Sequence, residues 1–131
     1  MPDPTLLIEK LEQIDEAINP MKRRFQDIRS PDDFLDTPEG IDKLDGISMM
    51  LIAIGEAFKK IDEETKGDLL SLHPEINWKG VKGVRDVLSH NYFNIDAEEI
   101  FFICKNNLEP LQNAVTHLIR KLQDKKIVLD R

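Results

Sequence analysis

The sequence predicts an all-α fold, an antiparallel bundle of four to five helices in which the first and last helices are kinked. Along three long segments the apolar side chains recur in steps of three and four, the spacing of one face of an α-helix. The connections between these segments are short, and no segment of comparable length shows the period of two of a half-buried strand. At 131 residues, the chain is expected to form a single domain, residues 1–131, around one core.

The first helix is expected over residues 5–29, where one apolar stripe is continuous. The stripe consists of Leu7, Leu11, Ile14, Ile18, Met21, Phe25 and Ile28. Pro20 lies inside this segment and has no backbone N–H to donate to the preceding turn. A kink or a short break is therefore predicted after Asn19.

Two capping signals predict how the chain turns into the second long helix. Ser30-Pro31 and Thr37-Pro38 each place a capping residue before a proline at the first helical position. We therefore expect a short helical turn over residues 32–35 and a long helix over residues 38–62. The apolar stripe of this long helix consists of Leu44, Ile47, Leu51, Ile54, Phe58 and Ile61.

A third helix is expected to begin after Asn77, whose side chain can cap it. A helical turn ending at Leu72 precedes it, and the following His73-Pro74 pair cannot stay in a regular helix. The apolar stripe of the third helix consists of Trp78, Val81 and Leu88.

Glycines inside helices predict where two helices approach closely. A glycine costs about 1 kcal/mol relative to alanine in a helix interior, unless close packing needs the missing side chain. Gly55 in the second long helix, and Gly80 and Gly83 in the third, are therefore expected at tight crossings.

The last helix is expected to start at Asp96, because Glu99 three residues later completes a capping signature. Its apolar stripe consists of Phe101, Cys104, Leu108, Leu111, Val115, Leu118 and Leu122. Pro110 is predicted to kink it. The single cysteine, Cys104, is expected in the core.

Composition excludes several classes of function. The net charge of −7 argues against a broad surface that binds nucleic acid by neutralising phosphates. One cysteine cannot form an intrachain disulfide, no apolar run approaches the roughly 20 residues of a membrane span, and no Cys/His cluster has zinc spacing. The start of the chain also lacks the order of a signal peptide. We therefore expect a cytoplasmic protein without metal or other cofactor.

Arg85 interrupts the apolar stripe of the third helix, and an unpaired buried guanidinium costs several kcal/mol. It must therefore pair or face a water-filled cleft, and Glu56, beside Gly55, is a plausible partner. On a regular helix Tyr92 lies about 20° and His90 about 140° around the axis from Arg85.

These three residue types suit phosphate chemistry. An arginine binds phosphate, a histidine transfers protons near neutral pH, and a tyrosine hydroxyl donates a hydrogen bond or accepts a transferred group. The alternative from these residues alone is structural, with Arg85 paired to a core glutamate, His90 exposed where the helix ends, and Tyr92 in the core with a hydrated tip.

Three blocks of the chain, which are IGEAFKK (54–60), HPEINWK (73–79) and RDVLSHNY (85–92), resemble the HEPN superfamily, and within it the HepT-like toxins of toxin-antitoxin pairs. The signature of that family is an arginine, four residues that begin with a polar one, here Asp86, then a histidine, one residue and a tyrosine. Arg85, His90 and Tyr92 satisfy every fixed position, and the resemblance extends over residues 6–122. Pro20 is the feature of this chain that has no assigned position in the family pattern.

The resemblance implies an all-α homodimer with a cleft where Arg85 and His90 of both protomers meet, supported by Glu56 and Asp86. It implies metal-independent cleavage of RNA, with His90 taking the proton of the ribose 2′-OH and Arg85 stabilising the charge that grows on the phosphorus. It also implies an MntA-type nucleotidyltransferase antitoxin that adenylylates Tyr92. The alternative function is a dimer that binds a nucleotide or RNA in the same cleft without cutting it.

Overall fold

The computed structural model describes residues 3–89 and 95–129. Within them the chain forms six α-helices, one short 3-10 helix and no strand, so the prediction of an all-α fold is confirmed. The helices are α1 (Pro4–Phe25), α2 (Asp32–Leu35), α3 (Pro38–Glu64), η1 (Leu70–Leu72), α4 (Trp78–Ser89), α5 (Ala97–Asn106) and α6 (Leu108–Leu129).

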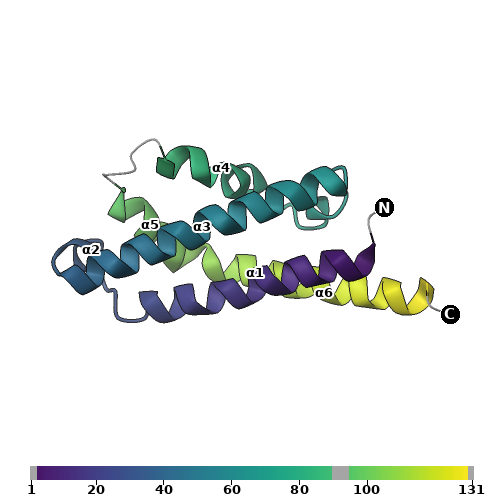
Figure 1. Ribbon diagram of the computed structural model, residues 1–131, viewed down its shortest axis with the longest axis horizontal. Helices are drawn as coiled ribbons and strands as arrows, with labels where there is room; N and C mark the ends of the chain where they lie inside the picture. The colour runs from purple at the N-terminus through teal and green to yellow at the C-terminus, as the bar shows by residue number, and fades with distance from the viewer. Residues whose placement is uncertain (1–2, 90–94, 130–131) are drawn as a thin grey trace.

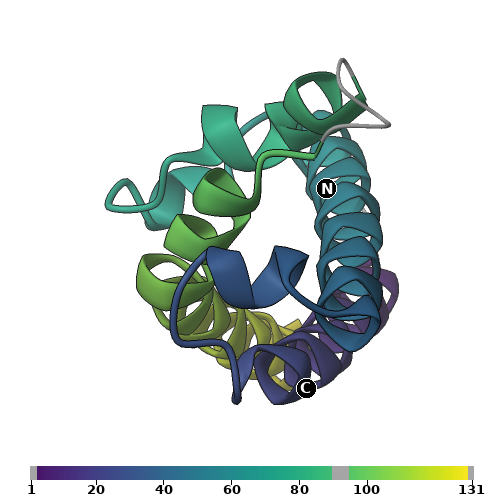
Figure 2. The ribbon, with the colours of Figure 1, turned by 90° about the vertical axis from the view of Figure 1, so that its left-hand side faces the viewer.

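The long helices lie side by side along one axis (Figure 1). α1 and α6 run antiparallel, so that the start of α1 and the end of α6 lie at the same end of the bundle. α1 packs against α6 and α3, and α4 packs chiefly against α3. Seen along the bundle, α4 lies at its edge, with α3 on one side and α5 on the other (Figure 2).

α1 departs from its predicted course at two points. The helix is continuous through Pro20, so the short break predicted after Asn19 is absent. It ends at Phe25 rather than near residue 29, although Ile28 remains buried beyond its end. The turn after α1 is held by the carboxylate of Asp33, which accepts hydrogen bonds from the backbone N–H groups of Arg29 and Ser30 at 2.7 and 3.2 Å.

α2 and α3 begin where the sequence predicted, but only one of the two expected caps is used. The hydroxyl oxygen of Thr37 accepts a hydrogen bond from the backbone N–H of Gly40 at 3.0 Å, and Pro38 is the first residue of α3. No side chain caps α2. All six residues of the predicted apolar stripe of α3 are buried.

The predicted last helix is two helices, α5 and α6, separated at Asn107. Asp96 caps α5 as expected, because its carboxylate accepts from the N–H groups of Glu98 and Glu99 at 3.0 and 3.2 Å. Pro110 lies in the first turn of α6, where a missing N–H costs little. In one continuous helix its ring would clash with the carbonyl of Asn106, so the chain breaks instead of kinking.

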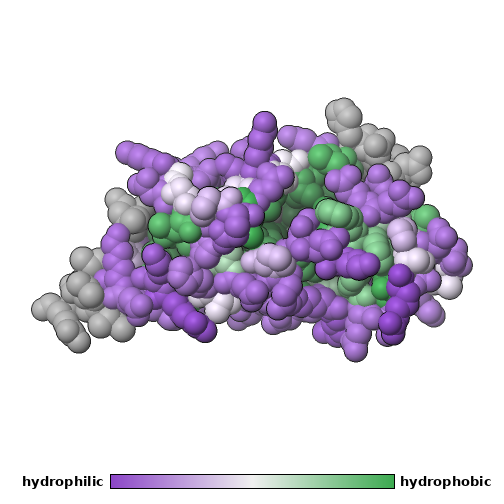
Figure 3. All heavy atoms as spheres, turned by 180° about the vertical axis from the view of Figure 1, so that it is seen from behind, coloured by the Kyte–Doolittle hydropathy of each residue, from purple (hydrophilic) through white to green (hydrophobic). Residues whose placement is uncertain are grey.

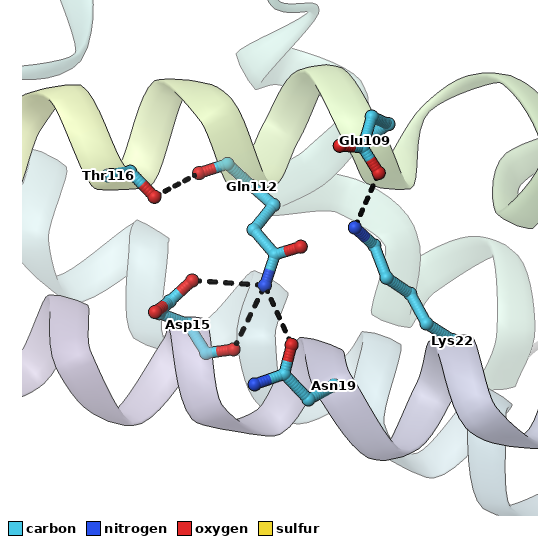
Figure 4. A network of polar contacts seen from close by, with 6 residues as sticks. All are labelled: Asp15, Asn19, Lys22, Glu109, Gln112 and Thr116. Atoms are coloured by element: carbon cyan, nitrogen blue, oxygen red, sulfur yellow. Dashed lines mark hydrogen bonds and ion pairs between the residues drawn. The ribbon is translucent and has the colours of Figure 1, made fainter.

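A polar network joins α1 and α6 on the outside of the core (Figure 4). The amide nitrogen of Gln112 donates to the carboxylate of Asp15 at 3.1 Å and to the side-chain oxygen of Asn19 at 3.0 Å. Lys22 forms an ion pair with Glu109 at 2.5 Å one turn further along. These contacts help to hold α6 in register on α1.

Within the described ranges, 3–89 and 95–129, no helix combines the length and the apolar character needed to span a lipid bilayer.

Candidate functional site

α4 lies unusually close to α3 because residue 55 has no side chain. A β-carbon placed on Gly55 would lie 2.6 Å from the carbonyl oxygen of Val81 and 2.9 Å from Cγ1 of Val84. The predicted tight crossing at Gly55 is therefore confirmed. The predictions for Gly80 and Gly83 are wrong: the three atoms nearest a β-carbon at Gly80 belong to the capping Asn77 and not to another helix, and a β-carbon at Gly83 would meet no described atom within 4 Å.

The first turn of α4 is held by hydrogen bonds and by an aromatic contact. The side-chain oxygen of Asn77 accepts from the backbone N–H of Gly80 at 3.1 Å, as its position before the helix predicted. The indole N–H of Trp78 donates to the carbonyl of His73 at 2.9 Å, and the ring packs against Phe58 of α3 with centroids 5.0 Å apart. The helix that carries Arg85 is thereby fixed in position from its first residue.

Arg85 is paired but not buried. Its Nη1 lies 3.4 Å from Oε1 of Glu56 on α3, so the predicted pairing is present within one chain. The side chain of Arg85 is 61% exposed, and that of Glu56 is 38% exposed. Arg85 therefore meets the expectation that it pairs or faces solvent: it pairs with Glu56, and α4 turns this part of its apolar stripe toward solvent.

Lys79, Lys82 and Asp86 are the other charged residues of α4. Lys82 forms an ion pair with Asp62 of α3 at 2.5 Å, and both side chains are largely shielded from solvent, so this pair adds a second link between the two helices. Asp86, the expected supporting residue, is exposed. The structure brings Arg85 and Glu56 together, and Asp86 follows Arg85 in α4 as an exposed residue.

The other two signature residues, His90 and Tyr92, lie outside the described residues. Their expected roles, and the angles around the helix axis predicted for them, therefore stay predictions.

A groove of about 550 Å³ between α4 and the α5–α6 pair is a feature that the sequence reasoning missed. Its lining is mostly apolar and includes Val81, Val84, Val87, Phe102, Ile103 and Leu111. Val87 and Phe102 remain 54% and 59% exposed at its edge. Figure 3 shows hydrophobic residues gathered in hollowed parts of a largely hydrophilic face. The signal in the sequence was the pair Val84 and Val87, which make α4 apolar beyond its predicted stripe.

Comparison with known families assigns the chain to one of them. A family model described as "Ribonuclease HepT-like" matches residues 10–118, which include Glu56, the whole of α4 and the complete signature. The chain belongs to the ribonuclease HepT-like family. Membership confirms the HepT-like resemblance that the three sequence blocks indicated.

Curated relatives of this ribonuclease HepT-like chain match it over a shorter range. A Methanocaldococcus jannaschii protein named "Putative RNase MJ0127" is 33% identical over 73 residues, 56% of this chain and 57% of that protein. A Thermococcus cleftensis protein named "Probable ribonuclease HepT" is 35% identical over 65 residues, 50% of this chain and 56% of that protein. The chain thus spans less than two thirds of the length of these relatives. No solved structure matches it significantly.

Proposed function

We propose that this ribonuclease HepT-like chain is the toxin of a HepT/MntA-type toxin-antitoxin pair and that it cleaves RNA without a metal ion. Its family supports the ribonuclease class, and the names of its relatives agree with that class. Within the chain, the observation that carries the proposal is the exposed Arg85, held at the surface of a rigidly packed helix by Glu56.

Arg85 is suited to bind the phosphate at the cleaved bond. Its guanidinium is always charged and offers N–H donors in a planar fork that matches phosphate oxygens. The contact with Glu56 is long, at 3.4 Å, and both side chains are accessible to solvent, so a phosphate can compete for the guanidinium. Glu56 then acts as a positioning residue that orients the arginine before RNA arrives.

In the proposed reaction His90 removes the proton from the ribose 2′-OH, and the 2′-oxygen attacks the adjacent phosphorus. The bond between phosphorus and the 5′-oxygen breaks, that oxygen takes up a proton, and a 2′,3′-cyclic phosphate remains. Arg85 stabilises the negative charge that grows on the phosphoryl oxygens during attack. No step requires a metal ion, because proton transfer and charge stabilisation are both supplied by side chains.

The active unit in this proposal is a homodimer formed through the face that carries α4. Val87 and Phe102 expose large apolar side chains at the edge of the groove, and contiguous apolar surface on a soluble protein marks an interaction site. A two-fold axis beside α4 would bring Arg85 of one protomer near His90 of the other, which removes the difficulty that a regular helix would direct the two about 140° apart.

Neutralisation is proposed to occur at Tyr92, through adenylylation by an MntA-like nucleotidyltransferase. The phenolic oxygen would attack the α-phosphate of ATP, lose its proton and release pyrophosphate. The attached nucleotide would place a phosphodiester beside Arg85 and compete with RNA for the guanidinium.

RNA cleavage in the presence of EDTA tests the proposal. Purified wild-type protein is incubated with total RNA and with a 5′-labelled oligonucleotide, and the 3′ ends of the products are analysed for cyclic phosphate. We expect cleavage by wild type and its loss in His90→Ala and Arg85→Met. Arg120→Met, which removes an exposed arginine from α6, is the matched control and should cleave as wild type does.

Two results would contradict the proposal. If wild type binds RNA but leaves it intact with or without Mg²⁺, the chain is a non-catalytic nucleotide- or RNA-binding dimer. If Arg120→Met loses as much activity as Arg85→Met, general positive charge rather than the exposed arginine of α4 is responsible.

A further inference from the structure

Two of the three histidines of the chain face each other where the loop before α4 meets α6. Nε2 of His73, in the loop before α4, lies 2.7 Å from Nδ1 of His117 on α6. The rings meet edge to face, with centroids 4.8 Å apart and planes inclined at 85°. Forty-four residues separate them in sequence, so the fold alone brings these two nitrogens together.

A carboxylate stands behind the first histidine. Oε1 of Glu75 lies 2.5 Å from Nδ1 of His73, the ring nitrogen that does not face His117. This contact places a proton on Nδ1 of His73, and in the neutral ring it therefore leaves a lone pair on Nε2, directed at His117. A histidine whose second nitrogen donates to a carboxylate is the usual arrangement of a histidine that binds a metal ion.

His73 is also held rigidly. Its backbone N–H donates to the carbonyl of Leu70 at 3.0 Å, and its own carbonyl accepts from the indole of Trp78 at 2.9 Å. Its side chain is only 13% exposed. His117, by contrast, is exposed on α6, so its ring can rotate and change tautomer at little cost.

We propose that His73 and His117 form a two-histidine site for a divalent transition-metal ion of the zinc class, with Glu75 orienting His73. Imidazole nitrogens suit Zn²⁺, Ni²⁺ and Cu²⁺. On binding, the proton on Nδ1 of His117 is displaced to solvent or moves to its Nε2. Two imidazoles on one tetrahedral ion have nitrogens about 3.4 Å apart, given bonds of about 2.0–2.1 Å. The pair at 2.7 Å must therefore open by about 0.7 Å, which rotation of the exposed His117 ring allows.

Solvent would complete the coordination. Among the described residues there is no group of three or more His, Cys, Asp or Glu side chains placed to hold an ion. The site is therefore open, with two protein ligands, and its effect is to tie the loop that starts α4 to α6. The inference is independent of the proposed ribonuclease activity, because it concerns binding and stability rather than RNA cleavage.

A titration with ZnCl₂ in chelator-free buffer at pH 7.5 tests the site. With three histidines in the chain, long-range ¹H–¹⁵N spectra of uniformly labelled protein resolve each imidazole. We expect saturable shifts at Nε2 of His73 and Nδ1 of His117, together with a rise in melting temperature. His117→Ala should weaken Zn²⁺ binding at least tenfold, and Glu75→Gln about tenfold, as losses of orienting carboxylates do.

His90→Ala is the matched control, since it removes one imidazole and keeps the pair; it should bind Zn²⁺ as wild type does. If His117→Ala unfolds, Glu75→Gln and the nitrogen shifts of wild type still decide the question. The proposal is overturned if Zn²⁺ leaves both histidine signals unchanged, or if His90→Ala alone abolishes binding.

Discussion

The carbonyl oxygen of Val81 occupies space that a side chain at Gly55 would need. A β-carbon at residue 55 would lie 2.6 Å from that oxygen, closer than real β-carbons come to other atoms. α3 and α4 therefore touch backbone to backbone at this point. Because α4 packs chiefly on α3, this contact sets the height of α4 above the bundle and so the position of Arg85.

Gly55→Ala is expected to destabilise the protein by about 1–3 kcal/mol, because a backbone carbonyl cannot rotate out of the way as a side chain can. Gly55→Leu should cost more. Helix propensity alone predicts that both substitutions stabilise the protein. Gly83→Ala is the matched control on α4: no described atom lies within 4 Å of its added carbon, so stability should rise by up to about 1 kcal/mol. Chemical denaturation measures the free energy of unfolding of each variant. A Gly55→Ala protein more stable than wild type would contradict the close contact.

Glu56 and Arg85 are expected to couple weakly in stability and strongly in function. A double-mutant cycle with Glu56→Gln and Arg85→Met should give a coupling free energy of about 0.2–1 kcal/mol, because both side chains are solvent-accessible. This coupling should be smaller at high salt. RNA cleavage should be lost in Arg85→Met and only reduced in Glu56→Gln. Strictly additive stabilities at low salt would show that the pair does not persist in solution.

Cys104 is expected to resist thiol reagents in the folded protein. Burial raises the pKa of its thiol from 9.0 to about 12, so at pH 8 only about one molecule in ten thousand carries the reactive thiolate. Because the folded pKa is the higher one, this group stabilises the fold fully below pH 9, and that contribution is lost as the pH rises from 9 toward 12. Rapid reaction with a thiol reagent at pH 8 without denaturant would contradict the burial.

Substitutions at the groove edge are expected to separate the proposed dimer. Phe102→Lys should convert a dimer to a monomer of about 15.1 kDa, because it places a charge in the proposed apolar contact. Met49→Lys, at an exposed apolar residue of α3 that does not line the groove, is the control and should stay dimeric. Light scattering over a range of concentrations measures both, and a wild-type mass of one chain throughout would refute the dimer.

Tyr92→Phe is expected to keep RNA cleavage and to escape neutralisation. When a nucleotidyltransferase antitoxin and ATP are supplied, wild type should gain a nucleotide adduct and lose activity, because the adduct competes with RNA at Arg85. Tyr92→Phe should gain no adduct and remain active, whereas His90→Ala should be inactive in either case. Intact-mass spectrometry that finds equal adducts on wild type and Tyr92→Phe would show that another residue is modified.

Much of the fold could be predicted because its signals are local. The cap residues Thr37, Asn77 and Asp96 act within three residues of themselves, and the spacing of apolar side chains along a helix does not depend on its neighbours. The break at Asn107 was one local error, and the early end of α1 at Phe25 was another. A proline among apolar residues is compatible with a kink in one helix or with the first turn of a new helix. Which of the two forms depends on whether the segments before and after the proline must pack against different helices.

For the candidate site, too, some features followed from the sequence and others depended on tertiary packing. The sequence by itself determined the residue types of the signature, the family they indicate, and the glutamate beside Gly55 that pairs with Arg85. Only the tertiary structure decided that Arg85 is exposed, that a groove separates α4 from α5 and α6, and that His73 meets His117. Exposure and contact depend on where a helix lies relative to the rest of the chain. That position is set by pairs such as Gly55 and Val81, whose interaction exists only once α3 and α4 have packed.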